Sequence, residues 1–222
     1  MMNAAAAVIL ARGGSKGISR KNLRLVCHTP LVALAVQAAK AAALVEWIYV
    51  STDDKEIAAV AESAGAEVIW RPKELATDDA DSNKAYRHAL EFVDVRCDVI
   101  VAIEATTLPH VPMDLDRAIR AIDDDHADSV IVVKRTATSL WRRGRDGYGM
   151  RINQYDAAPR QTADVEYEVT GACWAVRRAE LLRTGRIVCG RVALVERVMP
   201  FVDIDEPIDL AMAETLVKEL TR

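Results

Sequence analysis

A glycine-rich loop with four basic side chains, residues 11–23, directly follows the apolar run Ala4–Leu10. Its basic residues are Arg12, Lys16, Arg20 and Lys21. Glycines let backbone N–H groups approach an anion closely, and the cations neutralise the charge that remains. The spacing matches neither the P-loop nor the dinucleotide-binding fingerprint. The loop therefore predicts a site for several phosphates, with an ordinary turn as the alternative.

Two carboxylates flank an apolar residue near the end of the chain, in the order Asp203, Ile204 and Asp205. Because successive side chains of a strand point to opposite faces, both carboxylates are expected on one face and Ile204 in the core. Such a pair suits a cation, and Mg²⁺ prefers hard oxygen ligands. The pattern predicts a Mg²⁺ site, and it is also compatible with Asp205 capping a helix that begins at Pro207.

An arginine held beside a proline, Arg71-Pro72, follows the apolar run Glu67–Trp70. A fixed guanidinium presents a planar fork to a base edge with two acceptors, such as O2 and N3 of cytosine. A plain surface arginine is the alternative. Ser82 lies at the end of the same loop, and we expect it to cap the next helix.

Strand-like and helical patterns alternate along the chain and must position these loops. The expected strands are Ala4–Leu10, Trp47–Val50, Glu67–Trp70, Val99–Ile103, Ser129–Val133, Ala172–Val176 and Val202–Ile204. The expected helices are Pro30–Leu44 capped by Thr29, a helix from Asp54 to Gly65, Ser82–Val93, Met113–Asp123 and Pro207–Leu220. This order predicts an α/β fold with a mostly parallel sheet, which binds ligands at the carboxyl ends of its strands.

The alternation breaks at about residues 135–165, which are polar and rich in Gly and Arg. Tyr148, Met150 and Ile152 alternate there with polar or small residues, as in an antiparallel hairpin. We expect an excursion from the main sheet that pairs with a partner subunit, with a plain surface hairpin as the alternative.

Composition limits the remaining possibilities. The chain has 222 residues, 51% of them hydrophobic, which suits a single domain over residues 1–222. A net charge of −4 gives no global basic field for nucleic acid. The four cysteines are widely spaced, which favours reduced thiols and a cytoplasmic location. The apolar runs fall short of the roughly 18 residues of a membrane span, so no membrane partner is expected.

The motifs together resemble the CMP-sialic acid synthetases, or acylneuraminate cytidylyltransferases. The matching segments follow the family's order over nearly the whole chain: residues 12–23, Ser51-Thr52-Asp53-Asp54, Arg71-Pro72 with Glu74-Leu75-Ala76, Pro159-Arg160-Gln161, Gly171-Ala172 and Val202-Asp203-Ile204-Asp205. The resemblance implies a Rossmann-like nucleotidyltransferase with a small antiparallel dimerisation excursion, and hence a homodimer. It also implies Mg²⁺-dependent transfer of CMP from CTP to an acidic sugar, with release of pyrophosphate.

The resemblance also implies roles for single residues. The nucleotide would be bound by Arg12, Gly13, Ser15, Lys16, Lys21, Asn22, Arg71, Ala80 and Ser82. Among these, Asn22 and Ser82 would hold the ribose, and Arg71 with the backbone of Ala80 would read cytosine. Asp203 and Asp205 would hold Mg²⁺, and the catalytic groups would be Lys21, Arg12 and Asp205. The acceptor would lie against Glu104, Thr106, Arg160 and Gln161.

The segment after the fourth expected strand departs from the family. Where the family has Gln-Pro-Thr-Ser-Pro-Leu-Arg, this chain has Glu104-Ala105-Thr106-Thr107-Leu108-Pro109-His110. An ionised Glu104 would repel a sugar carboxylate placed as in the family, and His110 stands where the family has an arginine. We therefore expect an altered acid, either a modified ulosonic acid or a small phosphonate, compensated by Arg160, Lys134 or Arg135. The alternative is that Glu104 points to solvent or binds metal and that the usual sugar fits.

Two further alternatives concern the activity itself. The chain could be a non-catalytic nucleotide-binding relative, against which Lys21 and the pair Asp203 and Asp205 argue. It could also be a nucleotidyltransferase that uses another base, against which Arg71 argues. The sequence offers no nucleophile for a covalent intermediate, which favours direct attack of the acceptor on the α-phosphorus.

Overall fold

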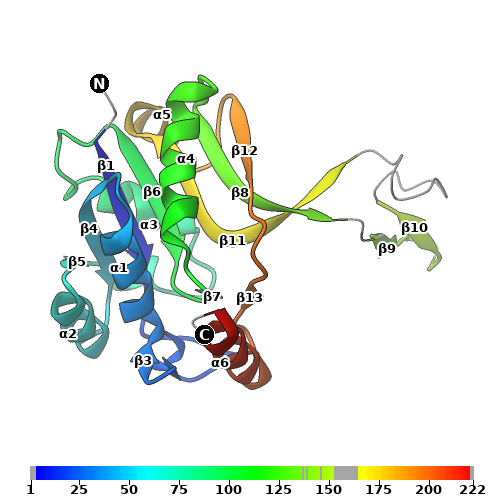
Figure 1. Ribbon diagram of the computed structural model, residues 1–222, viewed down its shortest axis with the longest axis horizontal. Helices are drawn as coiled ribbons and strands as arrows, with labels where there is room; N and C mark the ends of the chain where they lie inside the picture. Colours follow the sequence, from blue (N-terminus) through cyan, green and yellow to red (C-terminus); the bar gives the residue numbers. More distant parts are fainter. Residues whose placement is uncertain (1–3, 137, 139, 146, 153–164, 221–222) are drawn as a thin grey trace.

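A mostly parallel sheet forms the centre of the molecule. In the computed structural model, which describes residues 4–136, 138, 140–145, 147–152 and 165–220, this sheet has seven strands (Figure 1). In spatial order they are β12 (Val192–Glu196), β8 (Ser129–Thr136), β11 (Glu166–Arg177), β6 (Val99–Glu104), β1 (Ala5–Leu10), β4 (Val45–Thr52) and β5 (Glu67–Trp70). β11 runs antiparallel to β6 and β8, while the other neighbouring pairs are parallel. The expected fold class is confirmed.

Helices cover both faces of the sheet. Successive side chains of each strand point to opposite faces, so apolar side chains on both faces need a covering layer. Ala7 and Ile9 of β1 face α1 (Leu31–Ala41), α2 (Lys55–Ala64) and α4 (Pro112–Asp124). Ala6 and Val8 face α3 (Ser82–Ala89) and α5 (Arg178–Thr184). Both faces of β1 are buried, as a two-sided parallel sheet requires. None of the described helices is long and apolar enough to cross a bilayer.

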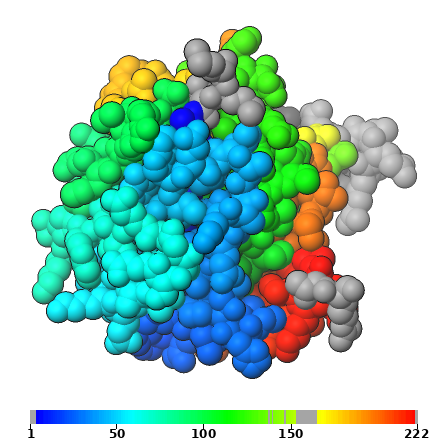
Figure 2. Space-filling view, turned by 60° about the vertical axis from the view of Figure 1, so that its left-hand side comes forward, coloured from blue at the N-terminus to red at the C-terminus, as the bar shows by residue number. Residues whose placement is uncertain are grey.

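A third packing unit joins the two ends of the chain. Helix α6 (Pro207–Leu220) packs on β2 (Leu25–Val26), which pairs with β3 (Thr29–Pro30). Figure 2 shows the red C-terminal segment beside the blue residues that follow β1. This contact places the loop after β1 next to the segment before α6.

Capping was predicted well at one helix and wrongly at two others. Asp54 caps α2 through its carboxylate, and Gly65 ends that helix at φ 105°, both as expected. Thr29 was expected to cap the first helix, but it pairs in β3, and Pro30 occupies the N-cap position. Ser82 was expected to cap α3, but Asp81 does so by accepting from the Asn83 N–H.

Several element ends differ from expectation, and some whole elements were not predicted, among them the short strands β2, β3 and β7 (Thr107–Leu108). Helix α1 stops at Ala41, which leaves Val45 to begin β4, and α3 stops at Ala89. The short helix α5 and the edge strand β12 were not predicted, and α5 has no side-chain cap to mark its start. Val202–Asp203 forms β13, which pairs with β7 (Thr107–Leu108) instead of joining the main sheet.

The antiparallel ribbon lies where the sequence predicted it. Strands β9 (Trp141–Arg143) and β10 (Gly149–Arg151) pair antiparallel, and they stand away from the main body beyond the ends of β8 and β11 (Figure 1). Its role in dimerisation stays a prediction, as does the single-domain division of the chain.

Candidate functional site

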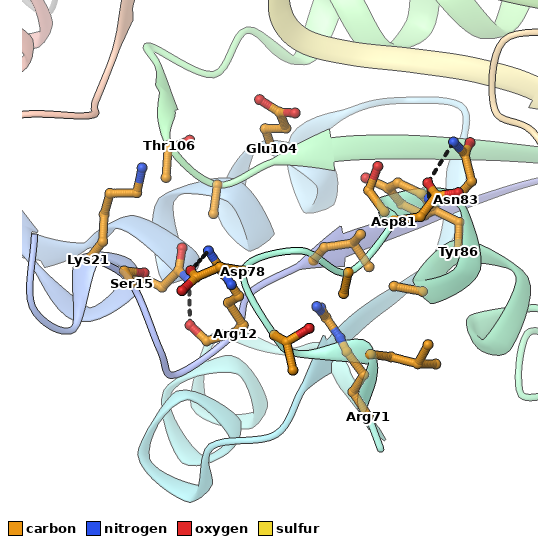
Figure 3. Close-up of a pocket in the computed structure, with 18 of the residues that line it drawn as sticks. Arg12, Ser15, Lys21, Arg71, Asp78, Asp81, Asn83, Tyr86, Glu104 and Thr106 are labelled. Carbon is orange, nitrogen blue, oxygen red and sulfur yellow. Dashed lines mark hydrogen bonds and ion pairs between the residues drawn. The ribbon is translucent and has the colours of Figure 1, made fainter. Parts of the chain in front are cut away.

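A cavity of about 860 Å³ opens at the carboxyl ends of the central strands. Loops after β1, β5 and β6 form its walls, together with α3 and the segment before α6 (Figure 3). The predicted site residues that line it are Arg12, Ser15, Lys16, Lys21, Asn22, Arg71, Ala80, Ser82, Glu104, Thr106, Asp203 and Asp205. Arg160 and Gln161 lie outside the described residues.

Asp78 bridges two cations of the predicted phosphate loop. One of its carboxylate oxygens lies 2.6 Å from Nη2 of Arg12, and the other lies 2.8 Å from Nζ of Lys16. The hydrogen bond from Lys16, followed by that from Arg12, lowers the pKa of the Asp78 carboxyl. The Asp78 carboxylate therefore lies between two side chains that were predicted to bind phosphate. The sequence did not predict this pairing.

The glycines of this loop serve close packing. A Cβ at Gly13 would lie 2.8 Å from Cβ of Asp54, and one at Gly17 would lie 2.6 Å from the Asp205 carbonyl oxygen. The Gly13 N–H donates to Asp53, 2.9 Å away, and Gly13 is not among the residues that line the cavity. Gly13 was predicted to bind nucleotide through its backbone. The absence of a side chain lets the loop approach Asp54, which follows β4, and nucleotide binding by Gly13 stays a prediction.

Lys21 links this loop to the two predicted metal carboxylates. Its Nζ lies 3.1 Å from Oδ1 of Asp205 and donates to the Ile204 carbonyl at 2.7 Å. Ile204 is fully buried, so Asp203 and Asp205 project together as expected. Burial, and then the charge of Asp205, raise the pKa of Asp203.

A divalent ion at this position would have two protein carboxylates. Within the described residues, no group of three or more His, Cys, Asp or Glu side chains is arranged to hold a metal. Mg²⁺ is commonly bound by one or two carboxylates together with substrate phosphates and water, so this donor set fits Mg²⁺. At the start of α6, the Asp209 carboxylate accepts from the N–H groups of Asp205 and Glu206.

Arg71 is a buried, oriented arginine and not a surface one. It is 7% exposed, and its guanidinium donates to the hydroxyl and the carbonyl oxygen of Ser51 at the end of β4. Burial lowers its pKa, although an arginine remains charged at neutral pH. In Figure 3 its guanidinium points from the side toward the middle of the cavity. Two strands thus fix the planar fork that was predicted to read a base.

The other end of the cavity lies beside β6 and β11. Glu104 ends β6. Desolvation of its carboxyl, followed by the charge of Asp203, raises its pKa to about 7. Thr106 donates to Asp203 at 3.4 Å, and the pairing of β7 with β13 brings this loop beside the carboxylates. The lining residues that were missed from the sequence include some that belong to no motif, among them Tyr86, Trp174, Arg186 and Val188.

His110 lies away from this cavity. It lines a separate space of about 10 Å³ with Asp114 and Cys173, on the α4 side of the sheet. Its Nε2 is buried without a hydrogen-bond partner in the described structure, and burial lowers its pKa to about 4. His110, which stands where the family has an arginine, therefore does not face the candidate site. Lys134 and Arg135, which were expected to compensate the charge of an altered acid, are also not among the lining residues.

Comparisons with known proteins agree with this geometry. The sequence pattern of a family described as cytidylyltransferase matches residues 6–144. The chain is 33% identical to N-acylneuraminate cytidylyltransferase A of Danio rerio, over 95% of this chain and 50% of that protein. It is 29% identical to CMP-N,N'-diacetyllegionaminic acid synthase of Legionella pneumophila, over 96% of this chain and 95% of that protein. It thus spans about half the length of the N-acylneuraminate cytidylyltransferases that it matches.

Solved structures share the fold. A CMP:2-keto-3-deoxy-manno-octonic acid synthetase complexed with CTP superposes with a TM-score of 0.76 at 17% identity, over 97% of this chain and 99% of that one. The family match takes in the loop after β1, Arg71 and Glu104, and the chain therefore belongs to the cytidylyltransferase family.

Proposed function

We propose that the protein transfers CMP from CTP to a sialic-acid-like ulosonic acid and releases pyrophosphate, with Mg²⁺ as its cofactor. One observation carries the proposal: a single cavity is lined by the cations Arg12, Lys16 and Lys21, by the buried Arg71, and by the carboxylates of Asp203 and Asp205. Cations suit a triphosphate, a fixed guanidinium suits a base, and the carboxylates suit Mg²⁺.

The chain's own residues position the two substrates. Arg12, Lys16 and Lys21 neutralise the phosphate oxygens, and Arg71 orients the base. An oxygen of the acceptor attacks the α-phosphorus in line, and its bond to phosphorus forms as the bond to the bridging oxygen breaks. Pyrophosphate leaves, and the acceptor hydroxyl gives its proton to water. The Mg²⁺ ion, when bound, supplies further charge neutralisation. Positioning and fixed charge provide most of the catalysis in phosphoryl transfer.

The acceptor class follows from the relatives and from the site. The relatives are named for N-acylneuraminate and for N,N'-diacetyllegionaminic acid, which supports a sugar acid and gives no support to a small phosphonate. When ionised, Glu104 at the end of β6 favours an acid whose carboxylate lies away from it. We infer a modified ulosonic acid as the substrate. A homodimer and a cytoplasmic location also remain predictions.

Pyrophosphate release from CTP tests this proposal. The panel contains N-acetylneuraminate, other ulosonic acids and a phosphonate, each with and without Mg²⁺, and Lys21→Ala serves as the inactive control. We expect Mg²⁺-dependent release with at least one ulosonic acid, more efficient than with N-acetylneuraminate. The absence of release with every ulosonic acid would refute the proposed activity. Efficient use of N-acetylneuraminate would refute only the altered acceptor.

A further inference from the structure

Arg186 is a cation of the cavity that the site described above leaves unused. It lies between α5 and β12 and lines the cavity. Within the part of the chain that the structure describes, its guanidinium makes no hydrogen bond and no ion pair. The other cations of the lining are each bonded to a protein oxygen: Arg12, Lys16, Lys21 and Arg71. Arg186 is therefore available to an anionic group of a ligand.

The backbone around Arg186 is fixed, so its side chain is aimed by the fold. Oγ1 of Thr184 accepts from the Arg186 N–H at 3.2 Å, and Oδ1 of Asn83 in α3 accepts from the Ile187 N–H at 3.0 Å. Ile187 is 6% exposed and packs in the core. Arg186 and Val188, on either side of this buried residue, both line the cavity. The segment thus presents one cation and one apolar side chain to the ligand.

This segment lies across the cavity from the phosphate loop. Figure 3 shows Asn83 on the opposite side of the cavity from Lys21. The hydrogen bond from the Ile187 N–H to Asn83 places the backbone next to Arg186 on the Asn83 side. The cations predicted to bind the triphosphate come from the other side. The anionic partner of Arg186 is therefore expected on the second substrate and not on the nucleotide.

The one labelled carboxylate on this side of the cavity, that of Asp81, is already engaged (Figure 3). It accepts from the backbone N–H of Asn83 at 2.9 Å and from the Asn83 side-chain amide at 3.0 Å, as the cap of α3. These two bonds lower the pKa of Asp81 more than the charge of Arg186 does. Asp81 therefore does not replace a ligand as the partner of Arg186.

The carboxylate of an acceptor acid supplies the anionic group that fits. An ionised Glu104 would repel it, and His110, which stands where the family has an arginine, lines a different space. A guanidinium binds a carboxylate through two parallel hydrogen bonds. We infer that Arg186 is a specificity-determining residue that binds the carboxylate of the acceptor acid. This inference rests on the proposed function and adds to it the cation that selects the acid.

The test compares Arg186→Gln with a matched control. Arg183→Gln also removes one exposed guanidinium, from a residue that is paired with Glu180 and is not among the lining residues. Arg186→Lys keeps the charge and loses the planar fork. For each protein, kcat and KM are measured for CTP and for the ulosonic acid that the unsubstituted enzyme uses best. The carboxamide of that acid, which has the same shape without the charge, is measured as a competitive inhibitor.

We expect Arg186→Gln to lower kcat/KM for the acid by roughly 10- to 100-fold, the effect of a lost hydrogen-bonded charge pair. The inhibition constant of the carboxamide should change by less than about fivefold, and the KM for CTP by less than about twofold. Arg186→Lys should lose less than Arg186→Gln, and Arg183→Gln should match the unsubstituted enzyme. The melting temperature should stay the same, because the guanidinium of Arg186 contacts no other described group.

Three results would overturn the inference alone. If Arg186→Gln uses the acid as well as the unsubstituted enzyme does, the guanidinium is only solvated. If the loss falls on the KM for CTP, Arg186 belongs to the nucleotide. Equal losses for the acid and its carboxamide would show that the carboxylate is not what Arg186 binds. By contrast, an unsubstituted enzyme that turns over no ulosonic acid refutes the proposed function, and this inference with it.

Discussion

At the residue scale, the cations of the site are paired with carboxylates, and a bound nucleotide must replace those carboxylates as the partners of the cations. Lys21 contacts Asp205, while Arg12 and Lys16 contact Asp78. Each of these cations was predicted to bind phosphate, and each is already paired with a carboxylate. The partly exposed pairs contribute little to stability, so a triphosphate can compete for the cations at low cost.

The carboxylate of Asp205 should be needed for turnover. We expect Asp205→Asn and Lys21→Ala to lower kcat by at least about 100-fold, the scale of one lost preorganised charge. Both proteins should fold, because the Asp205 side chain is 74% exposed and that of Lys21 18%. The measurement is kcat against Mg²⁺ concentration, with Glu206→Gln as the control. Full activity of Asp205→Asn at limiting Mg²⁺ would remove the metal assignment.

Arg71 should determine the choice of base. Arg71→Ala is expected to weaken CTP binding by about 1–3 kcal/mol and UTP binding much less, because a charged hydrogen bond to cytosine is lost. Nucleotide affinities are compared by competition among the four triphosphates. The melting temperature is recorded as well, since Arg71 is also bonded to Ser51. Equal losses for all four nucleotides would contradict a base-reading role.

Asp78 should oppose nucleotide binding. Asp78→Asn frees Arg12 and Lys16, so we expect CTP to bind more tightly at low salt, with the gain fading as salt screens it. Asp79→Asn, an exposed carboxylate on the same loop, is the control. Weaker binding in Asp78→Asn alone would instead show that Asp78 positions the two cations for the phosphates.

At the element scale, the segment between β6 and α4 contacts the buried guanidinium of Arg197. Arg197, 2% exposed, donates to the Pro109 carbonyl at 2.6 Å and lies 3.6 Å from a carboxylate oxygen of Asp114. His110 belongs to the same region and contacts the small cavity with Asp114. The loop that carries Glu104 and Thr106 is therefore fixed by residues on the opposite side of the sheet.

This arrangement makes stability depend on pH through His110. Its pKa is lowered from 6.5 to about 4 by burial, so the folded protein disfavours the protonated form. Above pH 6.5 the imidazole is neutral in both the folded and the unfolded protein, so the free energy of unfolding is not reduced by this group. The free energy of unfolding decreases as the pH falls from 6.5 toward 4. We expect a loss of roughly 1–3 kcal/mol over that window. The unfolding free energy of the wild type should fall more steeply than that of His110→Gln, and equal slopes would contradict the assignment.

At the scale of the whole molecule, the ribbon of β9 and β10 leaves large apolar side chains in solvent. Trp141, Met150 and Ile152 are 60%, 47% and 60% exposed, and the ribbon extends beyond the main sheet (Figure 1). An isolated two-stranded ribbon is marginal alone, and exposed apolar patches commonly mark interfaces. A second copy of the chain is the partner that we propose.

The protein should therefore be a homodimer in solution. Sedimentation at micromolar concentration should give twice the chain mass of 24.4 kDa, and Met150→Asp should shift it toward the monomer. Val95→Asp, at a residue that is 80% exposed and far along the chain from the ribbon, should not. A monomeric mass for the unsubstituted protein would contradict the prediction.

The sequence by itself determined six of the seven strands of the main sheet, most of the helices and the loops that carry the site. Strand alternation and the cap at Asp54 depend on residues close in the chain, so they can be read locally. The carboxyl ends of parallel strands lie at one edge, which explains why Arg12, Arg71 and Glu104 line one cavity.

Only the tertiary structure decided which side chains from different elements meet. Asp78 reaches Arg12 and Lys16 across the cavity, Tyr86 faces it from α3, and His110 turns to the far side of the sheet. These contacts depend on the order of strands, the antiparallel direction of β11 and the face that each loop presents. Such features arise from packing between distant segments, where local residue preferences carry no information.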